Sequence, residues 1–291
     1  MTRQLVFAFA IVFGAACGGN HGSGNDAGGG GDDGGGDGSV VIVDSPMFSG
    51  TCTPGGPQCS NCIDDDGDGR IDGFDPECTG PFDNDESSFA TGIPGDNMDA
   101  INQDCFFDGD SGAGNDGCNQ HVCCLLGATT KAECQTDLIG IVNNPSVEGN
   151  KYDVTKCFAP LGSAVIPAQC VNVCGPITPP GCDCFGCCTI CDPSTNICYD
   201  IAINAATSPD CTPDTLSDPT KCKTCTKTTA CEGPLCGGTS CVLCPGQDPN
   251  DLDPSCNGTA TCPTGITACP NGSGCPDQTY CSAGCCIGVI Q

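Results

Sequence analysis

Residues Cys62 to Cys78 read CIDDDGDGRIDGFDPEC, and the interpretation of the whole chain starts from this stretch. Six of its 17 residues are aspartate, three are glycine, and a cysteine stands at each end. Carboxylates at alternate positions followed by glycine are typical of a loop that wraps a hard cation, because alternate side chains converge on one centre. The stretch therefore predicts a calcium-binding loop.

The register of the loop identifies candidate ligands. With Asp64 as position 1, carboxylates fall at positions 1, 3, 5, 9 and 12, and Gly69 falls at the sharp turn of position 6. The candidate ligands are the side chains of Asp64, Asp66, Asp68, Asp72 and Asp75 and the main-chain carbonyl of Arg70. Asp72 is expected to act through water. Asp75 stands where the EF-hand pattern has a bidentate glutamate, and its shorter side chain is expected to supply a single bond.

No helix is expected on either side of the loop, since prolines and glycines precede it and Pro76 follows Asp75. In this respect the loop resembles the free-standing, cysteine-bordered aspartate loops of thrombospondin type 3 repeats and, more loosely, of dockerins. The resemblance covers residues 62–78. It implies bound calcium, with Cys62 and Cys78 as disulfide cysteines flanking the loop. The alternative is a solvated acidic turn, which Asp-Gly pairs also favour.

Two further acidic stretches follow the loop. Asp83, Asp85 and Glu86 either complete the coordination of the ion or form surface charge, and we expect surface charge. A weaker second calcium candidate lies between Cys105 and Cys118 and comprises Asp108, Asp110 and Asp116. The tetrapeptide 109–112, GDSG, also occurs around the nucleophile of chymotrypsin-like serine proteases, but no histidine stands in the order that this family requires.

The N-terminus predicts export. Residues 1–16 carry one arginine and then an apolar run too short to span a bilayer, as in a secretory signal peptide. The small residues before Cys17 resemble the cleavage box of bacterial lipoproteins, which implies that Cys17 becomes the lipidated first residue. Gly18 then implies sorting to the outer membrane. Ordinary signal cleavage, giving a secreted or periplasmic protein, is the alternative.

Residues 18–39 are almost entirely glycine, aspartate, asparagine and serine. Such a segment cannot bury enough apolar surface to offset its conformational entropy, so we expect a disordered tether. The run VVIV at 40–43 is expected to be the first strand of the folded part.

The cysteines indicate a disulfide-braced fold. The chain has 33, and an even 32 remain if Cys17 is lipidated. The pairs 222/225 and 241/244 have the spacing of a zinc ribbon, but so many cysteines produce CxxC pairs by chance, and export favours disulfides over zinc. Adjacent cysteines at 123–124, 187–188 and 285–286 are each expected to bond in two directions.

Composition completes the prediction of fold. The chain has no tryptophan and three tyrosines, so disulfides must replace a large aromatic core. We expect a small disulfide-rich, β and irregular fold with little regular secondary structure, several short strands and one helical turn near residues 130–135. The expected organisation is a signal peptide at 1–16, a lipidated tether at 17–39, a calcium-loop region at 40–88, a cysteine-rich β-type domain at 89–200 and disulfide-ladder modules at 201–291.

The formal net charge of −28 argues against nucleic acid as a partner and favours cations. The sequence predicts a non-enzymatic, exported, outer-membrane-tethered protein with structural calcium, a membrane contact through its lipid alone, and a role in adhesion or recognition of an unknown protein or glycan. One alternative is a thiolate protein that sequesters zinc or copper around residues 182–191. Another is a hydrolase with an unrecognised acidic site.

Overall fold

The computed structural model describes residues 53–90, 101–108, 118–135 and 152–289. Contacts divide the chain into two units, Met1–Ile42 and Val43–Gln291, and every described residue belongs to the second. The signal peptide, Cys17, the tether, the strand expected at 40–43 and the tetrapeptide at 109–112 lie outside the described residues.

The predicted fold class is confirmed, because the described strands form only short antiparallel pairs. These pairs are β1 (Asn102–Gln103) with β2 (Gln120–His121), β3 (Cys187–Cys191) with β4 (Cys198–Ala202), and β5 (Thr279–Ser282) with β6 (Cys285–Gly288). Strands β5 and β6 are joined by Ala283 and Gly284, both with positive φ, as a two-residue hairpin turn of type I′ requires.

Helices are equally short. The α-helices are α1 (Val122–Leu125), α2 (Lys131–Gln135) and α3 (Ala168–Cys174). The 3₁₀ helices are η1 (Gln58–Ser60), η2 (Asp72–Phe74), η3 (Phe106–Asp108), η5 (Val154–Lys156), η6 (Gly175–Ile177), η7 (Pro213–Thr215), η8 (Thr229–Cys231), η9 (Gly238–Ser240), η10 (Pro249–Asp251) and η11 (Pro254–Cys256). In the described part of the chain, no helix combines the length and the hydrophobicity that a membrane span needs.

Helix α3 differs from the expectation of short strands in this region, whereas α2 confirms the helical turn expected near residue 130. Pro167 supplies the N-cap of α3, and Cys170 and Cys174 lie one turn apart on its buried face. These two cysteines bond to Cys118 and Cys105. The disulfides thus fix a short helix that its β-branched residues alone do not favour.

Fifteen disulfides join described cysteines, and they fall into five groups that we call disulfide modules. The modules span residues 59–78, 105–174, 182–231, 236–256 and 262–286. No disulfide between two described residues joins one module to another. The boundary expected at residue 200 falls inside the third module, where the 184–231 and 187–225 disulfides cross it.

The adjacent cysteines bond in two directions, as predicted. Cys123 and Cys124 bond to Cys134 and Cys157. The pair at 187–188 bonds to Cys225 and Cys182, and the pair at 285–286 bonds to Cys262 and Cys275. Half-cystines fill much of the buried core, together with a few large apolar side chains such as Phe89, Phe185 and Ile190.

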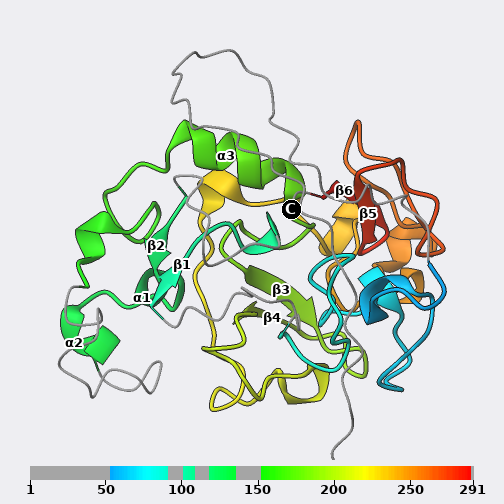
Figure 1. Ribbon diagram of the computed structural model, residues 1–291, viewed down its shortest axis with the longest axis horizontal. Helices are drawn as coiled ribbons and strands as arrows, with labels where there is room; N and C mark the ends of the chain where they lie inside the picture. The colour runs from blue at the N-terminus through cyan, green and yellow to red at the C-terminus, as the bar shows by residue number, and fades with distance from the viewer. Residues whose placement is uncertain (1–52, 91–100, 109–117, 136–151, 290–291) are drawn as a thin grey trace, which may run out of the picture. The chain divides into compact units, whose positions relative to one another are not determined.

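The acidic loop at 62–78 packs directly against the C-terminal hairpin of β5 and β6 (Figure 1). The Tyr280 hydroxyl donates a buried hydrogen bond to the Cys59 carbonyl at 2.9 Å, and the Ala283 N–H donates to the Gly73 carbonyl at 2.7 Å. A Cβ atom on Gly73 would lie 1.6 Å from the Cys281 carbonyl oxygen. Glycine is therefore required at position 73 for the loop to approach β5.

Candidate metal centre

The first half of the acidic loop is folded around its own carboxylates. The N–H groups of Gly67 and Gly69 donate to Asp64 at 2.6 and 3.1 Å. The Asp68 N–H donates to Asp66 at 3.0 Å, and the Arg70 N–H donates to Asp68 at 2.7 Å. Each carboxylate is thus oriented by a main-chain group further along the loop. Burial and the neighbouring charges of Asp68 and Asp64 raise the pKa of Asp66, so the three carboxylates lie close enough to repel.

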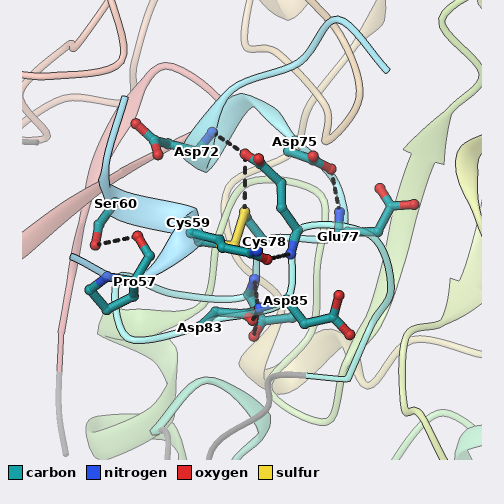
Figure 2. The surroundings of a disulfide bond; sticks show 12 residues. Pro57, Cys59, Ser60, Asp72, Asp75, Glu77, Cys78, Asp83 and Asp85 are labelled. Carbon is teal, nitrogen blue, oxygen red and sulfur yellow. Dashed lines mark hydrogen bonds between the residues drawn. A yellow bond between two sulfur atoms is a disulfide. The ribbon is translucent and has the colours of Figure 1, made fainter. Parts of the chain in front are cut away.

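The end of the loop contributes a buried acidic pair, Asp75 and Glu77 (Figure 2). The exposed fraction is 3% for Asp75 and 1% for Glu77. The Glu77 N–H donates to Asp75 Oδ1 at 2.9 Å, but Asp75 Oδ2 and Glu77 Oε2 are buried with no hydrogen-bond partner in the described structure. Burial raises the pKa of both carboxyls, and for Glu77 a side-chain hydrogen bond to Asp75 and the nearby charges of Asp75, Asp68 and Asp66 raise the pKa further.

Asp72 points elsewhere. Its carboxylate accepts hydrogen bonds from the N–H groups of Asn61 and Cys62, at distances of 3.0 to 3.2 Å. In Figure 2 this carboxylate is at the left, whereas Asp75 and Glu77 are at the right. Asp72 has a φ of +50°, which turns the chain into η2. The residue predicted at position 9 therefore holds the backbone at the start of the loop.

Asp83 and Glu86 are buried, so the expectation that they form surface charge is wrong. Glu86 is 0% exposed and accepts hydrogen bonds from the N–H groups of Asp65 and Asp72 at 2.6 and 2.8 Å. Asp83 is 1% exposed and accepts hydrogen bonds from Thr79, and burial raises its pKa to about 7. Glu86 thus supports the loop directly, Asp83 holds the segment that follows it, and Asp85 lies nearer the surface.

Arg70 connects the loop to the fourth disulfide module. Its guanidinium lies 3.5 Å from Asp248 and 3.6 Å from Asp251, where η10 begins and ends. The Arg70 carbonyl, the predicted ligand, accepts no hydrogen bond from any described residue. The guanidinium of Arg70 thus pairs with carboxylates of the fourth module and not with those of its own loop. Among the described residues, no lysine or arginine forms an ion pair with Asp64, Asp66, Asp68, Asp75 or Glu77.

A cavity of about 290 Å³ adjoins the site. The loop contributes Asp66, Asp68 and Glu77 to its wall. The remaining lining residues come from elsewhere in the chain and are Ser87, Pro193, Thr212, Pro213 and Asp214. Glu77 is therefore both a buried residue and a lining residue of a polar cavity.

These oxygens fit a hard divalent cation. The donor set consists of carboxylates with two buried oxygens that lack a partner, and oxygen donors are the ligands that calcium takes. Glu77 is the residue that the sequence reasoning missed, because it lies two positions beyond the end of the loop pattern. The signal that could have identified it is a second carboxylate, separated from Asp75 by Pro76 alone and directly before Cys78.

The flanking cysteines do not close the loop on each other. Cys78 bonds to Cys59, with an S–S distance of 2.01 Å, and Cys62 is disulfide-bonded to a partner outside the described residues. Both are disulfide cysteines, as the sequence predicts. Of the second calcium candidate, only Asp108 lies within the described part of the chain, where it is buried at the end of η3, and Asp110 and Asp116 lie outside it.

Cysteine clusters close enough to share a metal ion, such as Cys118, Cys170 and Cys174, consist of half-cystines. The four cysteines with zinc-ribbon spacing are also oxidised, with bonds to Cys211, Cys187, Cys256 and Cys236. Every cysteine among the described residues is disulfide-bonded, which leaves no thiolates at 182–191 for the alternative of zinc or copper sequestration.

Comparisons with protein-family models, with curated proteins and with solved structures gave no match for this chain. The resemblance to thrombospondin type 3 and dockerin loops therefore rests on residues 62–78 alone, and the geometry of the site carries the functional argument.

Proposed function

We propose that this is an exported, non-enzymatic, lipid-anchored surface protein whose disulfide-bonded body carries a structural calcium ion in the loop at 62–78. The direct ligands in this proposal are Asp64, Asp66, Asp68 and Asp75 together with the Arg70 carbonyl. Asp72 acts indirectly, by holding the backbone of Asn61 and Cys62. Display at the outer membrane suits adhesion to, or recognition of, a protein or glycan partner.

The observation that carries the calcium proposal is the buried Asp75 and Glu77 pair. The two buried carboxyls lie next to each other, each has one oxygen without a hydrogen-bond partner, and no lysine or arginine among the described residues forms an ion pair with them. An unpaired buried charge costs several kcal/mol or is neutralised by a proton or a cation. A calcium ion beside Asp66, Asp68 and Glu77 supplies the missing partner for Glu77 Oε2 and replaces the proton that otherwise neutralises the pair.

Isothermal titration with Ca²⁺ on the disulfide-intact protein tests this proposal. Changing Asp64→Ala together with Asp68→Ala removes two ligands and is expected to weaken calcium binding at least tenfold, about 1.4 kcal/mol. Asp277→Asn, an exposed carboxylate outside the site, is the matched control and is expected to bind as the wild type does. Unchanged affinity in the double variant would contradict a calcium site in this loop.

The anchoring proposal rests on the sequence of residues 1–18. Its test is the intact mass of the protein extracted from membranes, before and after EDTA and with alkylation of free thiols. We expect a diacyl or triacyl addition on Cys17, no alkylated cysteine, and a loss of mass on EDTA treatment equal to the bound calcium. A mature chain without lipid would contradict the anchor, and several alkylated thiols holding zinc or copper would contradict the whole assignment.

A further inference from the structure

The five disulfide modules are joined to one another, within the described residues, only by the backbone and by noncovalent contacts. The first module, 59–78, contacts the fifth through Tyr280 and Gly73 and the fourth through Arg70. The third module, 182–231, meets the first at the cavity of about 290 Å³. Any ligand that holds the third module against the loop would lie in this cavity.

The wall of the cavity has one sign of charge. Asp66, Asp68 and Glu77 line it from the first module and Asp214 lines it from the third, and no lysine, arginine or histidine is among its lining residues. Four acids facing a shared space repel one another unless a cation lies between them. The hydroxyl-bearing Ser87 and Thr212 on the same wall are further oxygen donors of the kind that calcium accepts, directly or through water.

Two observations at Glu77 point to a ligand within this space. The side chain is 1% exposed, and its Oε2 atom is buried without a hydrogen-bond partner. A glutamate that is buried at the wall of a polar cavity, with one oxygen unused, is suited to take a cation that enters from that cavity.

The opposite wall is rigidly built. Asp214 is the middle residue of η7, which begins with Pro213 and is closed by a capping box between Thr212 and Thr215. The adjoining disulfide Cys211–Cys222 fixes this turn within the third module. Asp214 itself is exposed and takes no part in the cap, so its carboxylate is available to a ligand.

We propose that the calcium ion of the loop is a bridge between modules, with Glu77 as an additional ligand from the first module and Asp214 as a ligand, direct or through water, from the third. This inference rests on the proposed function, since it assigns further ligands to the same ion. The bridge takes the place of a disulfide between these two modules and converts repulsion across the cavity into attraction.

The test compares Glu77→Gln and Asp214→Asn with the wild type, with Asp64→Ala/Asp68→Ala and with the Asp277→Asn control, using Ca²⁺ alone as the probe. Titration measures the affinity for Ca²⁺. Hydrogen exchange of the amides at 211–216, with and without Ca²⁺, measures whether the bound ion protects this part of the third module. We expect at least tenfold weaker binding for Glu77→Gln. Asp214→Asn is expected to bind about threefold more weakly and to lose the calcium-dependent protection at 211–216.

The outcomes separate this inference from the proposed function. If Asp64→Ala/Asp68→Ala abolishes binding while Glu77→Gln and Asp214→Asn bind as the wild type does, the loop binds calcium without a bridge and the inference is overturned. If the double variant also binds normally, the proposed function itself fails. Should Glu77→Gln fail to form its disulfides, the exposed Asp214 still decides, because protection at 211–216 that persists in Asp214→Asn overturns the bridge.

Discussion

Two buried acidic sites in this molecule are built in opposite ways. In the third module, Asp183 is 0% exposed, and its carboxylate accepts three main-chain hydrogen bonds, from Phe185 at 3.0 Å, Cys187 at 2.9 Å and Thr228 at 2.6 Å. In the first module, Asp75 and Glu77 are as deeply buried, yet each keeps an oxygen without a partner.

The comparison shows that this chain can satisfy a buried carboxylate with its own backbone. At Asp183 both oxygens are used, and the ammonium group of Lys227 lies near enough to favour the charged form. At Asp75 and Glu77 a single main-chain N–H donates, from Glu77 to Asp75 Oδ1, and no group donates to Asp75 Oδ2 or Glu77 Oε2 in the described structure. The difference separates a carboxylate whose two oxygens both accept hydrogen bonds within the protein from a pair in which each carboxyl keeps one oxygen without a hydrogen-bond partner.

The largest expected effect comes from reduction, which removes the frame on which both sites depend. Each disulfide contributes on the order of 2–4 kcal/mol by restricting the unfolded chain, and Asp183 is enclosed by the 182–188 and 184–231 disulfides of its module. We expect residues 105–286 to unfold in strong reductant, measured by circular dichroism. An unchanged spectrum after complete reduction, checked by alkylation and mass, would contradict a disulfide-supported fold.

Removal of the Asp183 carboxylate, whose two oxygens both accept hydrogen bonds, is expected to have the next largest effect. Asp183→Ala leaves three buried N–H groups without an acceptor, and we expect a loss of about 3–5 kcal/mol in the free energy of unfolding, since each lost partner costs about 1–3 kcal/mol. Asp183→Asn keeps one acceptor oxygen and should lose less. Denaturation with the disulfides intact measures both variants. A loss below about 1 kcal/mol for Asp183→Ala would remove the distinction between the two sites.

A pH series on the wild type and Asp183→Asn sharpens the comparison, because the difference between the two proteins reports Asp183. Burial raises its pKa from 3.8 to about 6, so between pH 4 and 6 the folded chain retains a proton that the unfolded chain has released. The contribution of Asp183 to the unfolding free energy then falls as pH rises through this window, by about 3 kcal/mol at about 1.4 kcal/mol per pKa unit. Burial also raises the pKa of Asp75 and Asp83, so stability falls in both proteins, and denaturation in EDTA at each pH should show a fall about 3 kcal/mol larger in the wild type than in Asp183→Asn. Parallel curves for the two proteins would contradict the assignment.

The fold class could be predicted because it depends on composition. A chain with 33 cysteines and few aromatic residues has little choice but a disulfide-braced, irregular structure. Helix α3 could not be predicted from its own residues, since Val171 and Val173 favour strands. It forms because Cys170 and Cys174 bond to partners more than fifty residues earlier, and such connectivity is not encoded in local sequence.

The candidate site was partly predictable for a related reason. Alternation of Asp64, Asp66 and Asp68 is a local pattern, so the role proposed for them is already suggested by the sequence alone. The direction of the Asp72 side chain depends on a positive φ, and the burial of Glu77 and Glu86 depends on contacts with other segments. Asp214 lies about 140 residues from the loop in the printed sequence, and only the fold brings it to the cavity.

The division into disulfide modules determines how this protein responds to a protease. A cut inside a module leaves both new ends linked through sulfur, so the chain stays covalently whole until it is reduced. A cut in the connecting segments 175–181, 232–235 or 257–261 separates modules that no disulfide between described residues holds together. After such a cut, what keeps the fragments assembled is their packing, the ion pairs of Arg70 and, in the proposal above, a single calcium ion.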